Sequence, residues 1–200
     1  MWGTGFIKEP EKGSKFFRKN IKFHSVRGAM SKAHLEGLLN QKLNIGTGDA
    51  GLLANYLFEK EIPKKYKLGI IPHFRQQNHP IFSQLRDRFN HSVIIDLKEE
   101  PISVIEQIGQ CEHILSSSLH GLIVADSFLI PNLHLDLSEN LKGDGFKFAD
   151  YYSSFGLEHT KISPHDIGDD LCNVIVDNYK LDAKTVELKR NEIVSSYPFK

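Results

Sequence analysis

The stretch HILSSSLHGLIVADSFLIP, residues 113–131, decides the fold of this chain. Its first four residues, 113–116, predict a short buried strand. Two serines follow as a polar turn, and the apolar segment 119–129 predicts a helix that ends before Pro131. A buried strand that passes through a short turn into a helix is the repeating unit of parallel α/β sheets.

The same alternation continues on both sides of this stretch. The predicted strands lie at 21–26, 42–45, 66–72, 92–97, 113–116 and 133–137, and the predicted helices at 31–40, 52–60, 80–89, 101–110, 119–129, 146–155, 164–179 and 182–195. This order predicts a Rossmann-like α/β fold, a mostly parallel sheet sandwiched by helices. Residues 1–200 are expected to form a single domain, with 160–200 as a C-terminal helical segment.

Composition and charge exclude several classes of protein. The 200 residues are 40% hydrophobic and carry 25 Lys+Arg against 25 Asp+Glu. This is enough apolar material for a packed core, and the charge is too balanced for a disordered chain. A net charge of zero argues against a nucleic-acid binder, so any anionic partner is expected to be small.

Cysteine usage and hydropathy indicate the compartment. Cys111 and Cys172 form neither a disulfide framework nor a CxxC half-site, so reduced thiols are predicted. The first 14 residues lack the apolar core of a signal peptide, and the apolar run 119–131 is too short to span a bilayer. The chain is therefore expected to be cytoplasmic.

Ser116, Ser117 and Ser118 stand at the carboxyl end of a predicted strand, where parallel sheets bind ligands. Their hydroxyls, together with free N–H groups of the helix that begins at Leu119, suit a phosphate or a carboxylate. His120 lies in the first turn of that helix, where the dipole favours the neutral imidazole. It is a candidate base, hydrogen-bond donor or proton shuttle, and a purely structural histidine is the alternative.

Basic side chains follow two other predicted strands. Arg27 comes after the strand 21–26, and His73 and Arg75 come after the strand 66–72. A guanidinium group binds carboxylate or phosphate through two parallel hydrogen bonds, so such groups at strand ends predict a site for a small dianion. For each arginine taken singly, a surface ion pair is the alternative.

Residues 46–51, GTGDAG, form a G-x-G-x-x-G sequence between a predicted strand and a predicted helix. A dinucleotide site is one interpretation. However, Asp49 places a carboxylate where pyrophosphate would bind, and no acidic residue follows at the spacing of a ribose ligand. The favoured interpretation is a structural turn of Gly48, Asp49 and Gly51, with Asp49 capping the helix.

The ten histidines do not indicate a metal site by themselves. Zinc-type spacings are absent, and His134 and Asp136, which share a strand face, have no identifiable third ligand. No metal ion is predicted.

Several short motifs occur along the chain in an ordered series. They are Trp2-Gly3-Thr4-Gly5, Val26-Arg27-Gly28, Gly48-Asp49-Ala50-Gly51-Leu52-Leu53, Ile71-Pro72-His73-Phe74, Ser116-Ser117-Ser118-Leu119-His120-Gly121-Leu122-Ile123, and Phe146-Lys147 with Asp150-Tyr151-Tyr152. In this order they resemble the polysaccharide pyruvyl transferase family, in particular bacterial exopolysaccharide ketal pyruvate transferases of the xanthan type. The resemblance covers residues 2–156.

The resemblance implies an enzyme that moves the enolpyruvyl group of phosphoenolpyruvate onto a sugar of an exopolysaccharide repeat unit as a ketal and releases phosphate, without a cofactor. It implies a glycan or lipid-linked oligosaccharide acceptor, peripheral contact with a membrane, and a fold like the C-terminal lobe of a GT-B enzyme. His120 matches the key histidine of the family and is the expected general acid/base. The expected donor ligands are Arg27, His73, Arg75, Ser116, Ser117, Ser118, Leu119 and Lys147.

Two features differ from the family pattern. Many members have arginine at the position of Ser118, so Arg75 or Lys147 is expected to meet the donor charge instead. Members also carry a segment before the Trp-Gly-x-Gly strand, so most of the first lobe is expected to be absent. A GT-B glycosyltransferase that uses a nucleotide-sugar and a non-catalytic homologue are the alternatives.

Overall fold

The computed structural model describes residues 1–11, 13–15, 20–137 and 145–199. The chain divides into two compact units, which are described separately. The first consists of Met1–Ala50, Glu139–His159 and Ala183–Lys200, and the second of Gly51–Ser138 and Thr160–Asp182. The assignment of 1–200 to one Rossmann-like domain with a helical segment at 160–200 stays a prediction.

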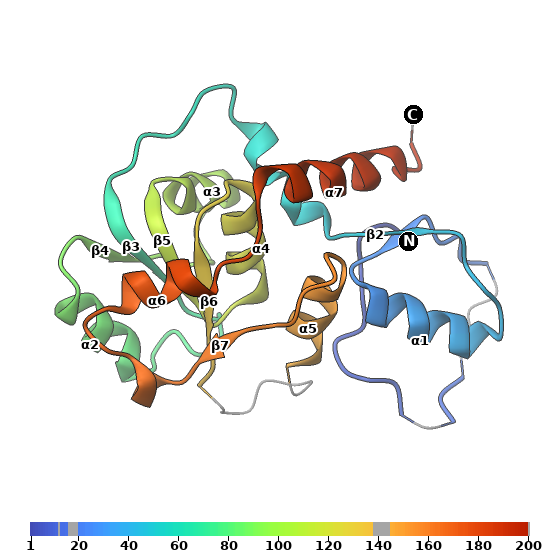
Figure 1. Cartoon of the computed structure of the whole chain (residues 1–200), viewed down its shortest axis with the longest axis horizontal. Coiled ribbons are helices and arrows are strands. Elements are labelled where there is room, and N and C mark those ends of the chain that lie inside the picture. The colour runs from blue at the N-terminus through green and yellow to red at the C-terminus, as the bar shows by residue number, and fades with distance from the viewer. Residues whose placement is uncertain (12, 16–19, 138–144, 200) are drawn as a thin grey trace. The chain divides into compact units, whose positions relative to one another are not determined.

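A five-stranded parallel sheet forms the centre of the second unit (Figure 1). Its strands are β3 (Tyr66–Ile71), β4 (Ser92–Ile94), β5 (Cys111–Ser116), β6 (Asn132–Leu135) and β7 (Lys161–Ile162), in the spatial order β4-β3-β5-β6-β7. β3 and β5 are neighbours and pair from Tyr66 opposite Cys111 to Ile71 opposite Ser116. The predicted parallel α/β sheet flanked by helices is confirmed.

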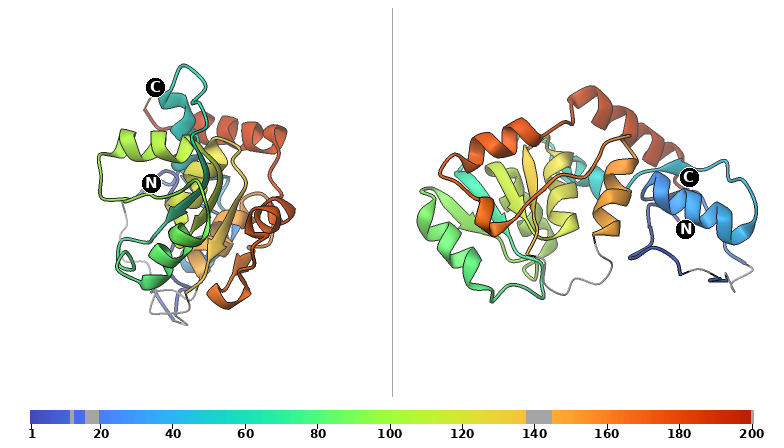
Figure 2. Two further views of the ribbon diagram at one scale, coloured as in Figure 1. Left: turned by 90° about the vertical axis from the view of Figure 1, so that its left-hand side faces the viewer. Right: turned by 60° about the horizontal axis from the view of Figure 1, so that its bottom comes forward.

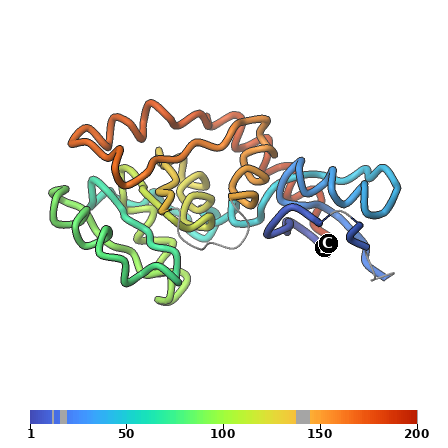
Figure 3. Tube along the Cα trace, turned by 90° about the horizontal axis from the view of Figure 1, so that it is seen from below, coloured from blue at the N-terminus to red at the C-terminus, as the bar shows by residue number. Residues whose placement is uncertain are grey.

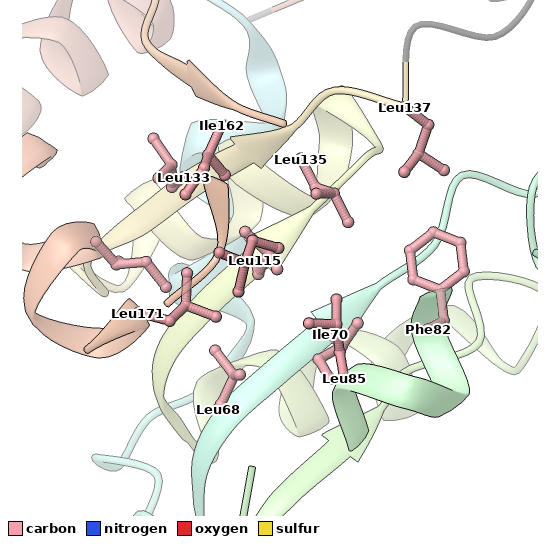
Figure 4. Close-up of a cluster of buried hydrophobic side chains, with 12 residues drawn as sticks. Leu68, Ile70, Phe82, Leu85, Leu115, Leu133, Leu135, Leu137, Ile162 and Leu171 are labelled. Carbon is pink, nitrogen blue, oxygen red and sulfur yellow. The ribbon is translucent and has the colours of Figure 1, made fainter. Parts of the chain in front are cut away.

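Helices cover both faces of this sheet (Figure 2). On one face, α2 (Pro80–Arg88) and α6 (Leu171–Asn178) enclose a buried cluster with alternate residues of the strands. Figure 4 shows Phe82 and Leu85 of α2 in this cluster. On the other face, α3 (Pro101–Gly109) and α4 (Leu119–Ser127) enclose a second cluster.

Local chemistry fixes the starts of α2 and α3. Each begins with proline, whose missing N–H would be unpaired there in any case. The Nδ1 atom of His79 accepts the Ile81 N–H at 3.2 Å, and the Glu100 carboxylate accepts the Ser103 N–H at 2.9 Å. Both residues therefore act as N-caps.

The first unit is smaller. Two-residue strands β1 (Ser25–Val26) and β2 (Gly46–Thr47) pair in parallel, and the unit also contains α1 (Ala29–Leu39), α5 (Phe146–Ser153) and α7 (Ala183–Ser195). The beginning and the end of the chain lie side by side here (Figure 3). The indole N–H of Trp2 contacts both the Ile193 carbonyl oxygen at 3.0 Å and the Ser196 hydroxyl at 3.1 Å.

The strand predicted at 42–45 is wrong, because β2 begins only at Gly46. Gly46 and Thr47 form the strand because they pair with Ser25 and Val26 of β1. Glycine also suits position 46, since a Cβ there would lie 2.9 Å from the Glu192 carboxylate of α7. The helix predicted at 52–60 is a 3-10 helix, η1 (Ala50–Leu57). Of the strand predicted at 21–26, only the last two residues are strand.

The continuous helix predicted at 164–179 is also wrong. The chain forms a short 3-10 turn, η2 (Pro164–Asp166), and then α6 from Leu171. Gly168 lies between them, and glycine is a poor helix former. Strand β7 was not predicted because two residues carry no periodic signal.

No helix among the described residues is both long enough and apolar enough to cross a membrane.

Candidate active site

The connections of the sheet change direction between β3 and β5. The chain leaves β3 toward β4 on one side, and then crosses back to β5 on the other side of β3. In parallel sheets such a switch point opens a crevice at the carboxyl ends of the two strands, where ligands bind. His73 and Arg75 follow β3, and Ser117 to His120 follow β5, so this edge of the sheet brings together most of the predicted site.

Ser116 and Ser117 tie these two connections together. The Ser117 hydroxyl accepts the backbone N–H of His73 at 2.8 Å, and its own N–H donates to the Ile71 carbonyl at 3.0 Å. The buried Ser116 hydroxyl lies within hydrogen-bond distance of two acceptors, the Ile71 carbonyl oxygen at 3.1 Å and the Ser118 carbonyl oxygen at 2.9 Å. These hydroxyls hold the turn, and their contact with a substrate stays a prediction.

The first turn of α4 presents backbone donors and one histidine at this edge. Ser118 is the N-cap with extended backbone, and its hydroxyl does not cap the helix. The first N–H bonded within the helix is that of Leu122, which donates to the Ser118 carbonyl at 3.4 Å. The N–H groups of 119–121 precede it and are therefore available to an anion. Leu119 is buried and His120 is exposed.

Gly121 brings α4 close to the strands. A Cβ at this position would lie 2.5 Å from the Ser116 hydroxyl and 3.1 Å from two side-chain carbons of Ile71. Only glycine lets the helix start this close to the ends of β3 and β5. The glycine of the Leu-His-Gly motif therefore positions His120 and the helix N–H groups.

The turn after β3 carries His73, Phe74 and Arg75. The Arg75 N–H donates to Nδ1 of His73 at 3.3 Å, so Nε2 carries the ring proton in this arrangement. The exposed Phe74 ring packs on His73, with 4.5 Å between centroids, and lies 5.4 Å from the guanidinium carbon of Arg75. Within the described ranges, Arg75 forms no ion pair. Its charge is thus open to an anionic ligand.

Arg27 belongs to the first unit and is 7% exposed. Its Nε atom donates to the Asp150 carboxylate at 2.9 Å, and Nη2 donates to the Phe6 carbonyl at 2.5 Å. The same carboxylate accepts the backbone N–H and the hydroxyl of Ser31 at 2.6 and 2.7 Å. The arginine forms an ion pair, buried rather than on the surface, and its role as a donor ligand stays a prediction.

Two glycines make room for this buried network. A Cβ on Gly28 would lie 1.6 Å from the Asp150 carbonyl oxygen, and one on Gly5 would lie 2.7 Å from the Asp150 carboxylate. The Arg27-Gly28 motif is therefore explained by packing against α5. No local sequence signal links Asp150 to Arg27, because the two positions lie far apart in the chain.

Lys147 is half-buried in the same unit. Its amine lies 5.1 Å from the centre of the Phe148 ring. Burial, and secondarily the charge of Arg27, lower the pKa of Lys147. The role of Lys147 as a ligand of the donor substrate stays a prediction.

The glycine-rich segment 46–51 packs against α7. The Thr47 N–H donates to Glu192 at 2.8 Å, and Lys189 donates to the Thr47 hydroxyl at 3.1 Å. Gly48 has a φ of +148°, and a Cβ there would lie 2.6 Å from Ile193. Because α7 pairs with Thr47 and fills the space beside Gly48, these two residues do not offer a phosphate cradle. Asp49 is buried and Gly51 lies in η1, and capping by Asp49 stays a prediction.

A cavity of about 370 Å³ lies at the opposite edge of the sheet. It is lined by the first residues of β3, the residues before β4 and the start of α6 with the two residues before it, including Lys67, Arg88, His91, Asp169 and Cys172. Arg88 is engaged there by Asp169 at 2.7 Å. None of the predicted site residues lines this cavity.

In the part of the chain that the structure describes, no group of three or more His, Cys, Asp or Glu side chains is placed to hold a metal ion. Asp136 forms an ion pair with Lys161 at 2.7 Å.

Comparison with known proteins identifies the family. The sequence model described as polysaccharide pyruvyl transferase matches residues 1–139. The chain belongs to the polysaccharide pyruvyl transferase family. The family resemblance expected from the ordered motifs is thus confirmed.

Two relatives extend this result. An uncharacterized protein of Acanthamoeba polyphaga mimivirus is 27% identical over 96% of this chain and 69% of its own length. The succinoglycan biosynthesis protein ExoV of Rhizobium meliloti is 28% identical over 70% of this chain and 43% of its own length. The chain therefore spans less than half of ExoV. No solved structure matches.

Proposed function

We propose that this pyruvyl transferase family member transfers the pyruvyl group of phosphoenolpyruvate to two hydroxyls of a polysaccharide sugar and releases phosphate. The observation that carries the proposal is the switch point between β3 and β5, where Arg75, His73, the N–H groups of 119–121 and His120 follow neighbouring strand ends. Family membership and the name of the relative ExoV support polysaccharide as the acceptor.

The phosphate and carboxylate of phosphoenolpyruvate match the hydrogen-bond donors and the positive charge at the carboxyl ends of β3 and β5. The first turn of α4 offers backbone N–H groups and the positive end of a helix dipole to the phosphate. Arg75 supplies a full positive charge, and His73 is a proposed ligand beside it in the same turn. The roles of Arg27 and Lys147 as ligands of phosphoenolpyruvate stay predictions from the sequence.

His120 is the proposed general acid/base. As imidazolium it protonates the methylene carbon of phosphoenolpyruvate, which leaves an oxocarbenium-like centre at the adjacent carbon. One sugar hydroxyl forms a C–O bond to this centre and gives up its proton to the now neutral His120. The C–O bond to phosphate then breaks, and a second hydroxyl attacks the same carbon and closes the ketal. Of the two hydroxyl protons, one thus ends on the new methyl group and the other on phosphate.

The proposal extends to architecture and location. We infer that the sheet of the second unit corresponds to the C-terminal lobe of a GT-B enzyme, which carries the donor site. The acceptor is then a glycan or a lipid-linked oligosaccharide reached by peripheral contact with a membrane from the cytoplasm.

Phosphate release tests the function. The wild-type chain is incubated with phosphoenolpyruvate and a succinoglycan oligosaccharide freed of acid-labile substituents, and acceptor-dependent phosphate is measured. We expect His120→Ala to lower kcat by about 10²- to 10⁴-fold, as loss of a general acid does. His165→Ala, which removes an exposed histidine of η2, is the matched control and should leave kcat unchanged.

Two outcomes decide against this assignment. Equal rates for His120→Ala and wild type would remove His120 from the chemistry. Acceptor-dependent turnover with a nucleotide-sugar but none with phosphoenolpyruvate would replace pyruvyl transfer with glycosyl transfer.

A further inference from the structure

Gln76 carries a buried side-chain amide that no group in the described part of the chain satisfies. Both its side-chain oxygen and its side-chain nitrogen are buried, and neither has a hydrogen-bond partner among the described residues. The neighbouring Gln77 differs, because its amide nitrogen donates to the Asp96 carboxylate. A buried amide without partners is rare in folded proteins, since the lost hydration is not compensated.

Gln76 lies in the turn that follows β3 at the switch point. Its backbone N–H donates to the His73 carbonyl at 2.7 Å, and its carbonyl accepts the N–H of His79 at 2.9 Å. The backbone of this residue is therefore fixed within the turn that also carries His73 and Arg75. The unsatisfied amide therefore belongs to the segment that the proposed reaction uses.

The two unpaired atoms restrict which ligand that is. The amide nitrogen needs an acceptor, and the amide oxygen needs a donor. Phosphoenolpyruvate, ionised at neutral pH, has no hydrogen-bond donor, so it would leave the oxygen unpaired. A sugar hydroxyl both donates and accepts, and two hydroxyls on adjacent carbons match a carboxamide at both atoms.

We propose that Gln76 binds a hydroxyl pair of the acceptor sugar, through its amide oxygen and nitrogen together. This inference rests on the proposed function and adds the acceptor side of the site. The donor is held by Arg75, His73 and the start of α4, and the acceptor sugar is oriented by Gln76 from the same turn.

Kinetics with separate variation of the two substrates tests the inference. Gln76→Leu should raise KM for the succinoglycan oligosaccharide by about 10- to 100-fold, because two hydrogen bonds are lost. KM for phosphoenolpyruvate should stay within twofold. Gln76→Glu keeps the acceptor oxygen and loses the donor, so it should raise the oligosaccharide KM less than leucine does. Gln84→Leu, on the exposed face of α2, is the control for the same chemical change.

The free protein supplies an independent readout. Gln76→Leu removes an uncompensated polar group, so its Tm without ligand should equal or exceed that of wild type. An unchanged oligosaccharide KM together with a raised Tm would overturn the inference, because the amide would then be only a buried defect. A raised KM for phosphoenolpyruvate alone would also overturn it.

Direct binding separates this inference from the proposed function. If wild type releases no phosphate, saturation-transfer NMR with the same oligosaccharide still decides the question. A signal in wild type that is lost in Gln76→Leu and kept in Gln84→Leu upholds the acceptor site. Equal signals, or none in wild type, reject it.

Discussion

Asp150 has no exposed surface, and Arg27 and Ser31 together give it three hydrogen bonds. Removing one partner of such a pair leaves the other charge buried and unpaired. We expect Asp150→Ala to lower the free energy of unfolding by about 3–5 kcal/mol, measured by urea denaturation. Asp87→Ala removes an exposed carboxylate paired with Arg86 and should change it by less than about 0.5 kcal/mol. Equal losses of unfolding free energy in the two variants would show that the buried pair of Asp150 with Arg27 is worth no more than an exposed one.

Lys147 predicts a pH-dependent stability. Burial, and then the charge of Arg27, lower its pKa in the folded state. Between that lowered pKa and the ordinary value of 10.5, the unfolded chain binds more protons, so this residue makes stability rise with pH. Lys147→Met should therefore raise Tm at neutral pH, and the gain should shrink as the pH rises toward 10.5. A gain that does not vary with pH would contradict the assigned cause.

At the scale of residues, sequence patterns indicate which side chains are candidate ligands, but not which other side chains they pair with. His73, Arg75 and the serines were found because they directly follow apolar runs, and strand ends meet at one edge of a sheet. The ion pair of Arg27 with Asp150 joins positions far apart in the chain, and the unpaired amide of Gln76 appears only when its surroundings are known. Neither has a local signature.

The position of α4 depends on Gly121. A Cβ there would approach the Ser116 hydroxyl and Ile71, both fixed in the core. Gly121→Ala should lower the free energy of unfolding by about 1–3 kcal/mol through overpacking. It should also reduce kcat by displacing His120.

Gly37 in α1 is the matched control for this substitution. A Cβ there meets nothing within 4 Å, so Gly37→Ala should stabilise the protein by about 0.5–1 kcal/mol through helix propensity alone. Thermal unfolding of both variants gives the comparison. Stabilisation by Gly121→Ala would contradict the close approach of α4 to the strands.

At the scale of elements, the length of each strand or helix determines whether its position can be predicted from the sequence. Six-residue strands β3 and β5 and the helix after β5 gave continuous apolar signals, and their positions were predicted closely. The two-residue strands β2 and β7 were missed or misplaced because pairing with neighbours, not local pattern, selects them. The break before α6 came from Gly168, which a periodicity count passes over.

The reactivities of the Cys111 and Cys172 thiols measure whether the sheet of the second unit is folded. Cys111 is fully buried in β5, and burial raises its pKa to about 12, whereas Cys172 is only partly buried. The thiolate is the reactive form, so a thiol reagent should modify Cys172 first and Cys111 only when the sheet unfolds. Mass spectrometry after timed alkylation in increasing urea measures this. Rapid labelling of Cys111 in native buffer would contradict the burial of β5.

For the whole molecule, the strand order turns scattered motifs into one candidate site. The charge balance of the chain fits a protein that meets a small anion with a few placed donors, and the switch point gathers them after β3 and β5. The cavity of about 370 Å³ at the other edge of the sheet holds none of these residues. Topology, not cavity size, is the reason to place the donor there.

The most direct test of this placement is a two-dimensional ¹H–¹⁵N NMR titration with phosphoenolpyruvate, which needs no acceptor and no turnover. The site predicts the largest shifts at the backbone amides of 73–76 and 117–121. Shifts concentrated instead around Lys67, Arg88 and His91, or along 46–51, would contradict it.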